Sequence, residues 1–134
     1  MRKMIVMLML ATLSLSAVAQ KVSYQTIARC ARDMKTQDYG RVQVSDIRIV
    51  KDGNSAVWLG ADKYSVVTVD RNIQTDSIQS VQYTTLDSLG QEFVVIFNHD
   101  IYNSVPLMRY QVILFDANKP YDWTYYFAKE PENM

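Results

Sequence analysis

Residues 22–38 carry hydrophobic side chains at spacings of three and four positions. Such spacing places them on one face of a helix, and the polar residues of the segment fall on the opposite face. Ser23 can cap the start of this helix, and Gly40 follows its end. The pattern predicts one amphipathic N-terminal helix. Its inward face would be formed by Tyr24, Ile27, Ala28, Ala31 and Met34.

After Gly40 the pattern changes to short stretches of alternating or continuous hydrophobic residues. Turn-forming residues such as Asp52-Gly53-Asn54, Asp70-Arg71-Asn72 and the stretch 116–120 separate these stretches. The segment 73–85 is polar and reads as one edge-like strand or two shorter pieces. The predicted strands are residues 42–49, 57–59, 64–69, 73–85, 93–97, 108–115 and 121–128.

These elements predict an α+β fold, with the N-terminal helix packed on an antiparallel meander of about seven strands. None of the connections after Gly40 is long enough for a parallel crossover. An open curved sheet, a barrel-like sheet and a two-layer arrangement all fit the pattern. The order of elements is similar to that of cystatin-like or lipocalin-like small domains. No motif of either family is present, so this likeness implies no function.

The first 19 residues have the features of a signal peptide. Arg2 and Lys3 precede a hydrophobic run, and Ala17-Val18-Ala19 offers small residues at a cleavage site. The run is shorter than the ~20 residues that span a bilayer. We therefore expect cleavage after Ala19, a single domain over residues 20–134 without a transmembrane segment, and export to the periplasm or the extracellular space if the source is bacterial.

Charge and cysteine content exclude several classes of function. Loss of Arg2 and Lys3 reduces 14 basic residues to 12, against 14 acidic ones, which is a net charge of about −2. The basic residues are scattered, and this argues against a nucleic-acid partner. Cys30 is the only cysteine, so no internal disulfide can form. No residue near it in sequence would lower the pKa of its thiol, and we expect it to be an inert, partly covered side chain.

Catalytic and metal-binding candidates are few. His99 is the only histidine, and with Asp100 or another carboxylate it could serve a small hydrolase or lyase, although no nucleophile motif accompanies it. One His and one Cys are too few for a zinc site. Calcium is a weak alternative, since Asp and Asn also favour turns for backbone reasons. The calcium candidates are Asp52, Asn54, Asp70 and Asn72. We expect no cofactor.

Counting hairpins gives a further geometric expectation. In a simple meander successive turns alternate between the two ends of the sheet. The connections near Asp52, Asp70 and His99 would then share one end, and those near Ala61, Asp87 and Asp116 the other. The first of these ends would be the most polar rim of the molecule.

The last predicted strand is rich in aromatic residues. Tyr121, Trp123, Tyr125 and Phe127 alternate along one face, and Tyr126 lies on the other. Such a row can stack on sugar rings or contact a protein, although burial in the core is the alternative for Trp123 and Phe127. We expect an exported, non-enzymatic binding or interaction domain whose partner is a protein or a carbohydrate, and a homodimer stays open. The predicted ligand-binding residues are Tyr121, Trp123, Tyr125 and Tyr126.

Overall fold

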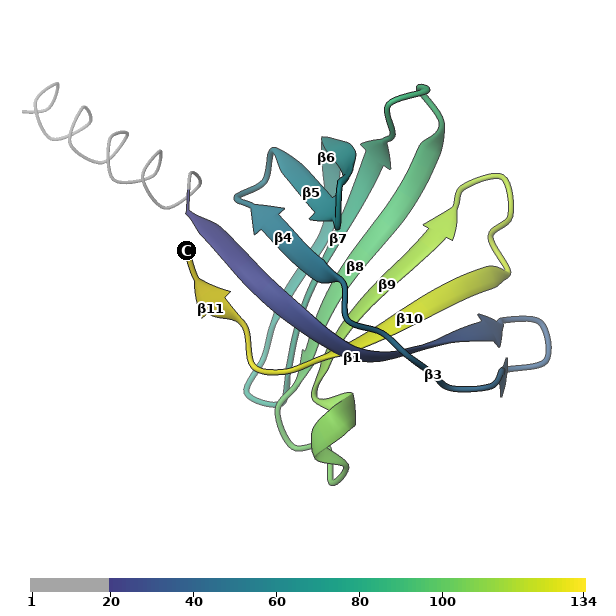
Figure 1. Ribbon diagram of the computed structural model, residues 1–134, viewed down its shortest axis with the longest axis vertical. Coiled ribbons are helices and arrows are strands. Elements are labelled where there is room, and N and C mark those ends of the chain that lie inside the picture. The colour runs from purple at the N-terminus through teal and green to yellow at the C-terminus, as the bar shows by residue number, and fades with distance from the viewer. Residues whose placement is uncertain (1–19) are drawn as a thin grey trace, which may run out of the picture.

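The computed structural model describes residues 20–134, which form a closed antiparallel barrel of eight strands (Figure 1). These residues contain no α-helix, and their one helical turn is the 3-10 helix η1 (Pro106–Met108). The predicted α+β class is therefore wrong, whereas the predicted antiparallel pairing is confirmed. The barrel strands are β1 (Lys21–Asp33), β4 (Arg48–Asp52), β5 (Ala56–Leu59), β6 (Asp62–Gln74), β7 (Ile78–Leu86), β8 (Glu92–Asp100), β9 (Tyr110–Asp116) and β10 (Asp122–Ala128).

Neighbouring strands in the barrel are neighbours in sequence, except where β10 pairs with β1 and closes it. Three two-residue strands, β2 (Asp38–Tyr39), β3 (Gln43–Val44) and β11 (Glu132–Asn133), add to the edges of β1. Figure 1 shows the last of these, with the C-terminus, beside the beginning of β1. The C-terminal end of the described chain is thus paired with β1, the strand that begins it.

The segment predicted as a helix is the strand β1, and a β-bulge explains the error. The pairing of β1 with β10 shifts register between Thr26 and Ala28. A bulge inserts one extra residue and reverses the phase of the alternation. On one face of a regular strand, residues are spaced by two. Across the bulge one such spacing becomes three, and two successive regular spacings add up to four, so the sequence resembles that of a helix. Ile27 and Ala31, predicted to face inward, are exposed in the structure.

A second difference concerns the predicted turn at Asp70. Residues 62–74 form one continuous strand, and the chain turns at residues 75–77 instead. The Asp70 carboxylate accepts hydrogen bonds from Thr68 at 2.6 Å and from Thr84 on β7 at 2.5 Å. These bonds let a turn-forming residue remain in a strand, beside two register shifts in the β6–β7 ladder.

The connections lie at two ends of the barrel. We call the mouth the end that carries the turns 53–55 and 75–77, the loop 101–109 with η1, the start of β1 and the segment 129–134. The far end carries the connections 34–37, 60–61, 87–91 and 117–121. The tight turn after β5 needs Gly60, whose φ is 61°. Asp52 and His99 thus lie toward the same end of the barrel, and Asp70 is not in a turn.

Two hydrophobic clusters lie on opposite faces of the same sheet. Successive side chains of a strand point to opposite faces. The inner cluster fills the barrel, with side chains from β4, β5, β7, β8, β9 and β10 packed around Tyr83, Val95 and Phe97. The outer cluster covers the outward faces of β1, β8, β9 and β10. Its buried members are Ala28, Cys30, Val94, Ile96, Ile113, Tyr125 and Phe127.

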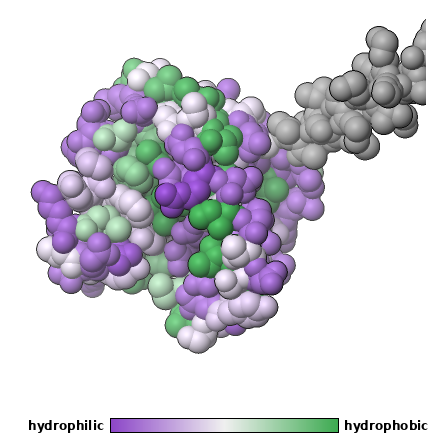
Figure 2. All heavy atoms as spheres, turned by 180° about the vertical axis from the view of Figure 1, so that it is seen from behind, coloured by the Kyte–Doolittle hydropathy of each residue, from purple (hydrophilic) through white to green (hydrophobic). Residues whose placement is uncertain are grey.

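Figure 2 shows the side of the molecule opposite to that in Figure 1. Hydrophobic residues there form small groups among hydrophilic ones. In residues 20–134 no helix has the length and hydrophobicity needed to cross a membrane. The predicted signal peptide lies outside these described residues.

Candidate functional site

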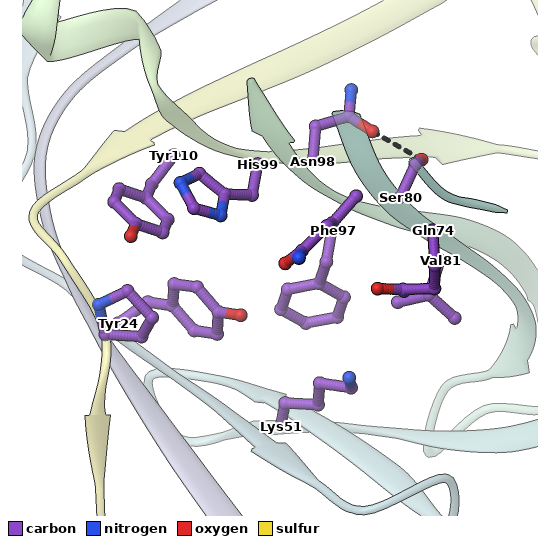
Figure 3. A pocket seen from close by; sticks show the side chains of 11 residues that line it. Tyr24, Lys51, Gln74, Ser80, Val81, Phe97, Asn98, His99 and Tyr110 are labelled. Atoms are coloured by element: carbon purple, nitrogen blue, oxygen red, sulfur yellow. Dashed lines mark hydrogen bonds between the residues drawn. The ribbon is translucent and has the colours of Figure 1, made fainter. Parts of the chain in front are cut away.

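The mouth of the barrel contains a cavity of about 300 Å³ (Figure 3). Its walls combine aromatic rings with amide, hydroxyl and ammonium groups, and none of the lining residues is acidic. Glu130 lies nearby and contributes to the raised pKa of Tyr110. The cavity is lined by Tyr24, Lys51, Gln74, Gln79, Ser80, Val81, Phe97, Asn98, His99, Tyr110 and Pro131. A polar and aromatic cavity at a barrel mouth is a common place for a small ligand.

Several lining side chains occupy inward-facing positions of their strands, close to the mouth. Lys51 lies two residues after Ile49, which is fully buried in the inner cluster. His99 lies two residues after Phe97, another member of that cluster. The ladders set Tyr24 opposite Ile49, and Tyr110 opposite His99. The inward-facing positions are hydrophobic in the middle of the barrel. Toward the strand ends at the mouth, the inward-facing positions are polar.

Aromatic contacts fix the walls of the cavity. The imidazole of His99 stacks on the Tyr110 ring, with a centroid distance of 4.2 Å and an interplanar angle of 14°. The Tyr24 ring lies 5.2 Å from that of Phe97, and the Tyr83 ring meets Phe97 edge-on at 6.1 Å. These separations are those of favourable aromatic pairs. The cavity thus has flat and preformed walls.

Lys51 is the only Lys or Arg side chain in the lining. Its Nζ lies 5.7 Å from the centre of the Phe97 ring and 5.9 Å from that of Tyr83. Burial lowers the pKa of its ammonium group, and no charged neighbour in residues 20–134 contributes to this shift. A half-buried cation held by ring faces alone keeps its capacity to donate hydrogen bonds.

The tyrosine hydroxyls near the cavity differ in their partners. Burial, with a smaller effect of Tyr110, raises the pKa of Tyr24 to about 12. Burial, with a smaller effect of Tyr24, raises the pKa of Tyr83 to about 12 as well. The Tyr83 hydroxyl donates to Asn54 Oδ1 at 2.7 Å. The Tyr24 hydroxyl points into the cavity toward Phe97 (Figure 3). Tyr24 therefore presents a neutral donor to the cavity.

His99 faces the cavity, but Asp100 does not share its position. Because the two are adjacent in β8, their side chains point to opposite faces. Asp100 accepts a hydrogen bond from Asn103 Nδ2 at 3.1 Å. The structure therefore does not bring together the pair considered for a hydrolase or lyase.

The four residues considered for calcium are separated or engaged in hydrogen bonds. Asn54 accepts from Tyr83, and Asn72 accepts from Gln74 at 3.0 Å. Asp70 is held by two threonines within β6, whereas Asp52 ends β4. Among the described residues 20–134, no three or more His, Cys, Asp or Glu side chains are grouped as metal ligands would be.

The aromatic residues of the last strand are mostly covered. Tyr125 and Tyr126 are 5% and 8% exposed, and Tyr126 belongs to the inner cluster. Trp123 is half-buried and stacks on Phe115 at 4.9 Å. Tyr121 is exposed, with the Lys35 ammonium 5.0 Å from its ring centre. The four predicted ligand-binding residues thus lie on two faces of β10 and at its far end, and they form no open aromatic row.

Cys30 lies in the outer cluster and is 4% exposed. Burial raises the pKa of its thiol, and the nearby Arg32 opposes this shift only in part. The position fits a small packed side chain in the protonated form.

Two other cavities lie outside the barrel. One, of about 440 Å³, is lined by Ser23, Gln25, Arg48 and the stretch 129–132. It holds acidic and basic groups together, and Arg48 donates to Ser23 Oγ at 3.1 Å. Another, of about 310 Å³, lies beside Arg29, Cys30 and Arg41. Neither has aromatic walls.

Sequence reasoning singled out His99 but missed Tyr24 and Lys51. Tyr24 was assigned to a helix. Lys51 follows Ile47 and Ile49 at a spacing of two, so it falls on the same face of the strand. A charged residue on an otherwise hydrophobic face was the sequence feature that could have indicated it. Comparisons of the chain with protein-family models, curated proteins and solved structures gave no match.

Proposed function

We propose that this protein is an exported, non-enzymatic binding protein that holds a small ligand in the mouth of its barrel. One observation carries the proposal: a cavity of about 300 Å³ lies where aromatic and polar side chains of six strands meet. The engineered apolar cavity that binds benzene has a volume of about 150 Å³. The mouth can therefore accommodate a ligand of about two fused rings.

Preformed walls support binding rather than catalysis. Rigid aromatic contacts reduce the entropy that a ligand or a side chain loses on association. The single imidazole is stacked on Tyr110, and no carboxylate lines the cavity to orient it. The residues present can enclose, stack on and hydrogen-bond a ligand without a chemical step.

Backbone amide chemical shifts test the site of binding. Small aromatic compounds, neutral and charged, would be added to the protein in two-dimensional ¹H–¹⁵N spectra. We expect shifts at Val81, Phe97 and His99. Shifts confined to β10 and the 117–121 turn would contradict the proposal and favour the aromatic strand.

Two tryptophan variants of β7 test whether the shifts come from a ligand in the mouth. Gln79 is exposed and faces the cavity, so Gln79→Trp should fill the mouth and abolish the shifts. Gln82→Trp places the same ring on the outer face of the same strand and should leave them unchanged. Equal responses of the two variants would show that the ligand is not in the mouth.

A further inference from the structure

We infer that the ligand of the mouth is a small organic carboxylate with a flat hydrophobic body. The carboxylate would contact the Lys51 ammonium and the Tyr24 hydroxyl. The inference rests on the proposed function and adds the chemical class of the ligand.

The charge of the cavity favours an anionic ligand. The Lys51 ammonium is half-buried, and burial lowers its pKa without an acidic partner among the described residues. A desolvated cation is unfavourable unless it is paired. The remaining lining residues include no carboxylate. An anion is the group that completes this site.

Two hydrogen-bond donors of the lining suit a carboxylate. Figure 3 shows the Tyr24 hydroxyl directed toward one side of the Phe97 ring and the Lys51 ammonium beneath that ring, and both residues line the cavity. Both groups donate hydrogen bonds, and burial keeps the Tyr24 phenol protonated far above neutral pH. A carboxylate has two oxygens and accepts from two such donors, and its charge strengthens both bonds.

The shape of the remaining space favours a flat hydrophobic body. Val81 and the rings of Phe97, His99 and Tyr110 form hydrophobic and flat walls. A hydrated inorganic anion would leave these walls without contacts. A fused aromatic ring system can stack on them, and it matches a volume of about 300 Å³.

The test compares 2-naphthoate with the neutral isostere 2-naphthamide by isothermal titration calorimetry. We expect the carboxylate to bind at least about tenfold more tightly, which is the size of one charge-assisted hydrogen bond. Lys51→Met should remove this preference and leave the affinity for the amide within about twofold. The retained binding of the amide would show that the mouth of the variant is intact.

Lys63→Met is the matched control. The Lys63 ammonium also lies over a ring, 5.7 Å from the centre of Trp58, but it is exposed and does not line the mouth. Its removal should change neither affinity.

Three outcomes would overturn the inference in different ways. Equal affinities of acid and amide, with amide shifts at the mouth, would refute the carboxylate and leave the binding function standing. A preference for the acid that survives Lys51→Met would place the anion elsewhere. Failure of both compounds to bind would refute the carboxylate and the proposed function together.

Discussion

Arg32 and Lys51 each lie over two aromatic rings, and they differ in whether the cation has hydrogen-bond partners. On the outer face, the Arg32 guanidinium lies 4.3 Å from the centre of the Tyr39 ring and 5.8 Å from that of Tyr125. It also donates to the Tyr125 hydroxyl at 3.1 Å and to Gln37 Oε1 at 2.9 Å. In the mouth, the Lys51 ammonium lies 5.7 and 5.9 Å from the centres of two rings, and among residues 20–134 it has no such acceptor.

Arg32 makes a structural contact, whereas Lys51 belongs to the proposed binding site. The partners of Arg32 come from the turn after β1, from β2 and from β10, so the guanidinium holds this hairpin against the barrel. The same combination in the mouth is incomplete, because the donors of Lys51 and Tyr24 face a cavity. Aromatic content alone therefore does not identify a site, whereas an unpaired donor beside a cavity does.

The largest expected difference between the faces is in packing. Phe97 is 5% exposed inside the barrel, and Phe97→Ala should lower the free energy of unfolding by about 3–5 kcal/mol. Phe115 is half-buried on the outer face, and Phe115→Ala should cost about 1 kcal/mol. Urea denaturation measures both. Equal losses would contradict the assignment of Phe97 to the interior.

Alkaline pH should lower the stability of the fold through ionisation of Tyr24, which lines the mouth. The folded pKa of Tyr24 is about 12, above its value of 10.0 in the unfolded chain, so its stabilising effect is complete below pH 10 and is lost as the pH rises toward 12. The loss would approach ~2–3 kcal/mol. Urea denaturation of Tyr24→Phe at pH 9 and pH 11 should show a weaker decline than wild type. Tyr121→Phe, at an exposed site, should not change the decline.

Removal of each cation should have opposite effects on stability. Arg32→Met loses its hydrogen bonds and ring contacts, and the free energy of unfolding should fall by about 1 kcal/mol. Lys51→Met removes a desolvated charge, and the free energy should stay constant or rise by up to about 1 kcal/mol. Thermal and urea denaturation at pH 7 compare the two. Similar losses would mean that Lys51 has a structural partner.

The smallest effect concerns Cys30 in the outer cluster. Because this thiol is 4% exposed, it should react with a soluble thiol reagent only after unfolding. Cys30→Ala should leave the oligomeric state unchanged under oxidising conditions. A disulfide-linked dimer on a non-reducing gel, absent in the variant, would show that the thiol is accessible.

Part of this fold was predictable because its signals are local. The turn at Asp52-Gly53-Asn54 and the hydrophobic runs of β8 and β9 follow from short-range preferences. The bulge near Ile27 was not visible, because one inserted residue makes strand spacing resemble helical spacing. Closure depends on pairing between β1 and β10, at opposite ends of the described chain, which no local pattern encodes.

The site was less predictable than the fold for the same reason. Tyr24, Lys51 and His99 come from three strands, and only the register of the closed barrel brings them to one cavity. Local reasoning favoured the dense aromatic run of β10 instead. Its side chains divide between the inner and outer clusters, since alternation sends neighbours to opposite faces.

The mouth of the barrel is the proposed place of ligand binding. Isotope-filtered nuclear Overhauser measurements on labelled protein with unlabelled 2-naphthoate test this most directly. We predict contacts from the naphthalene protons to the side chains of Tyr24, Val81 and Phe97. Contacts to Phe115, Tyr121 or Trp123 in their place would contradict the account, because they would put the ligand on the outer surface.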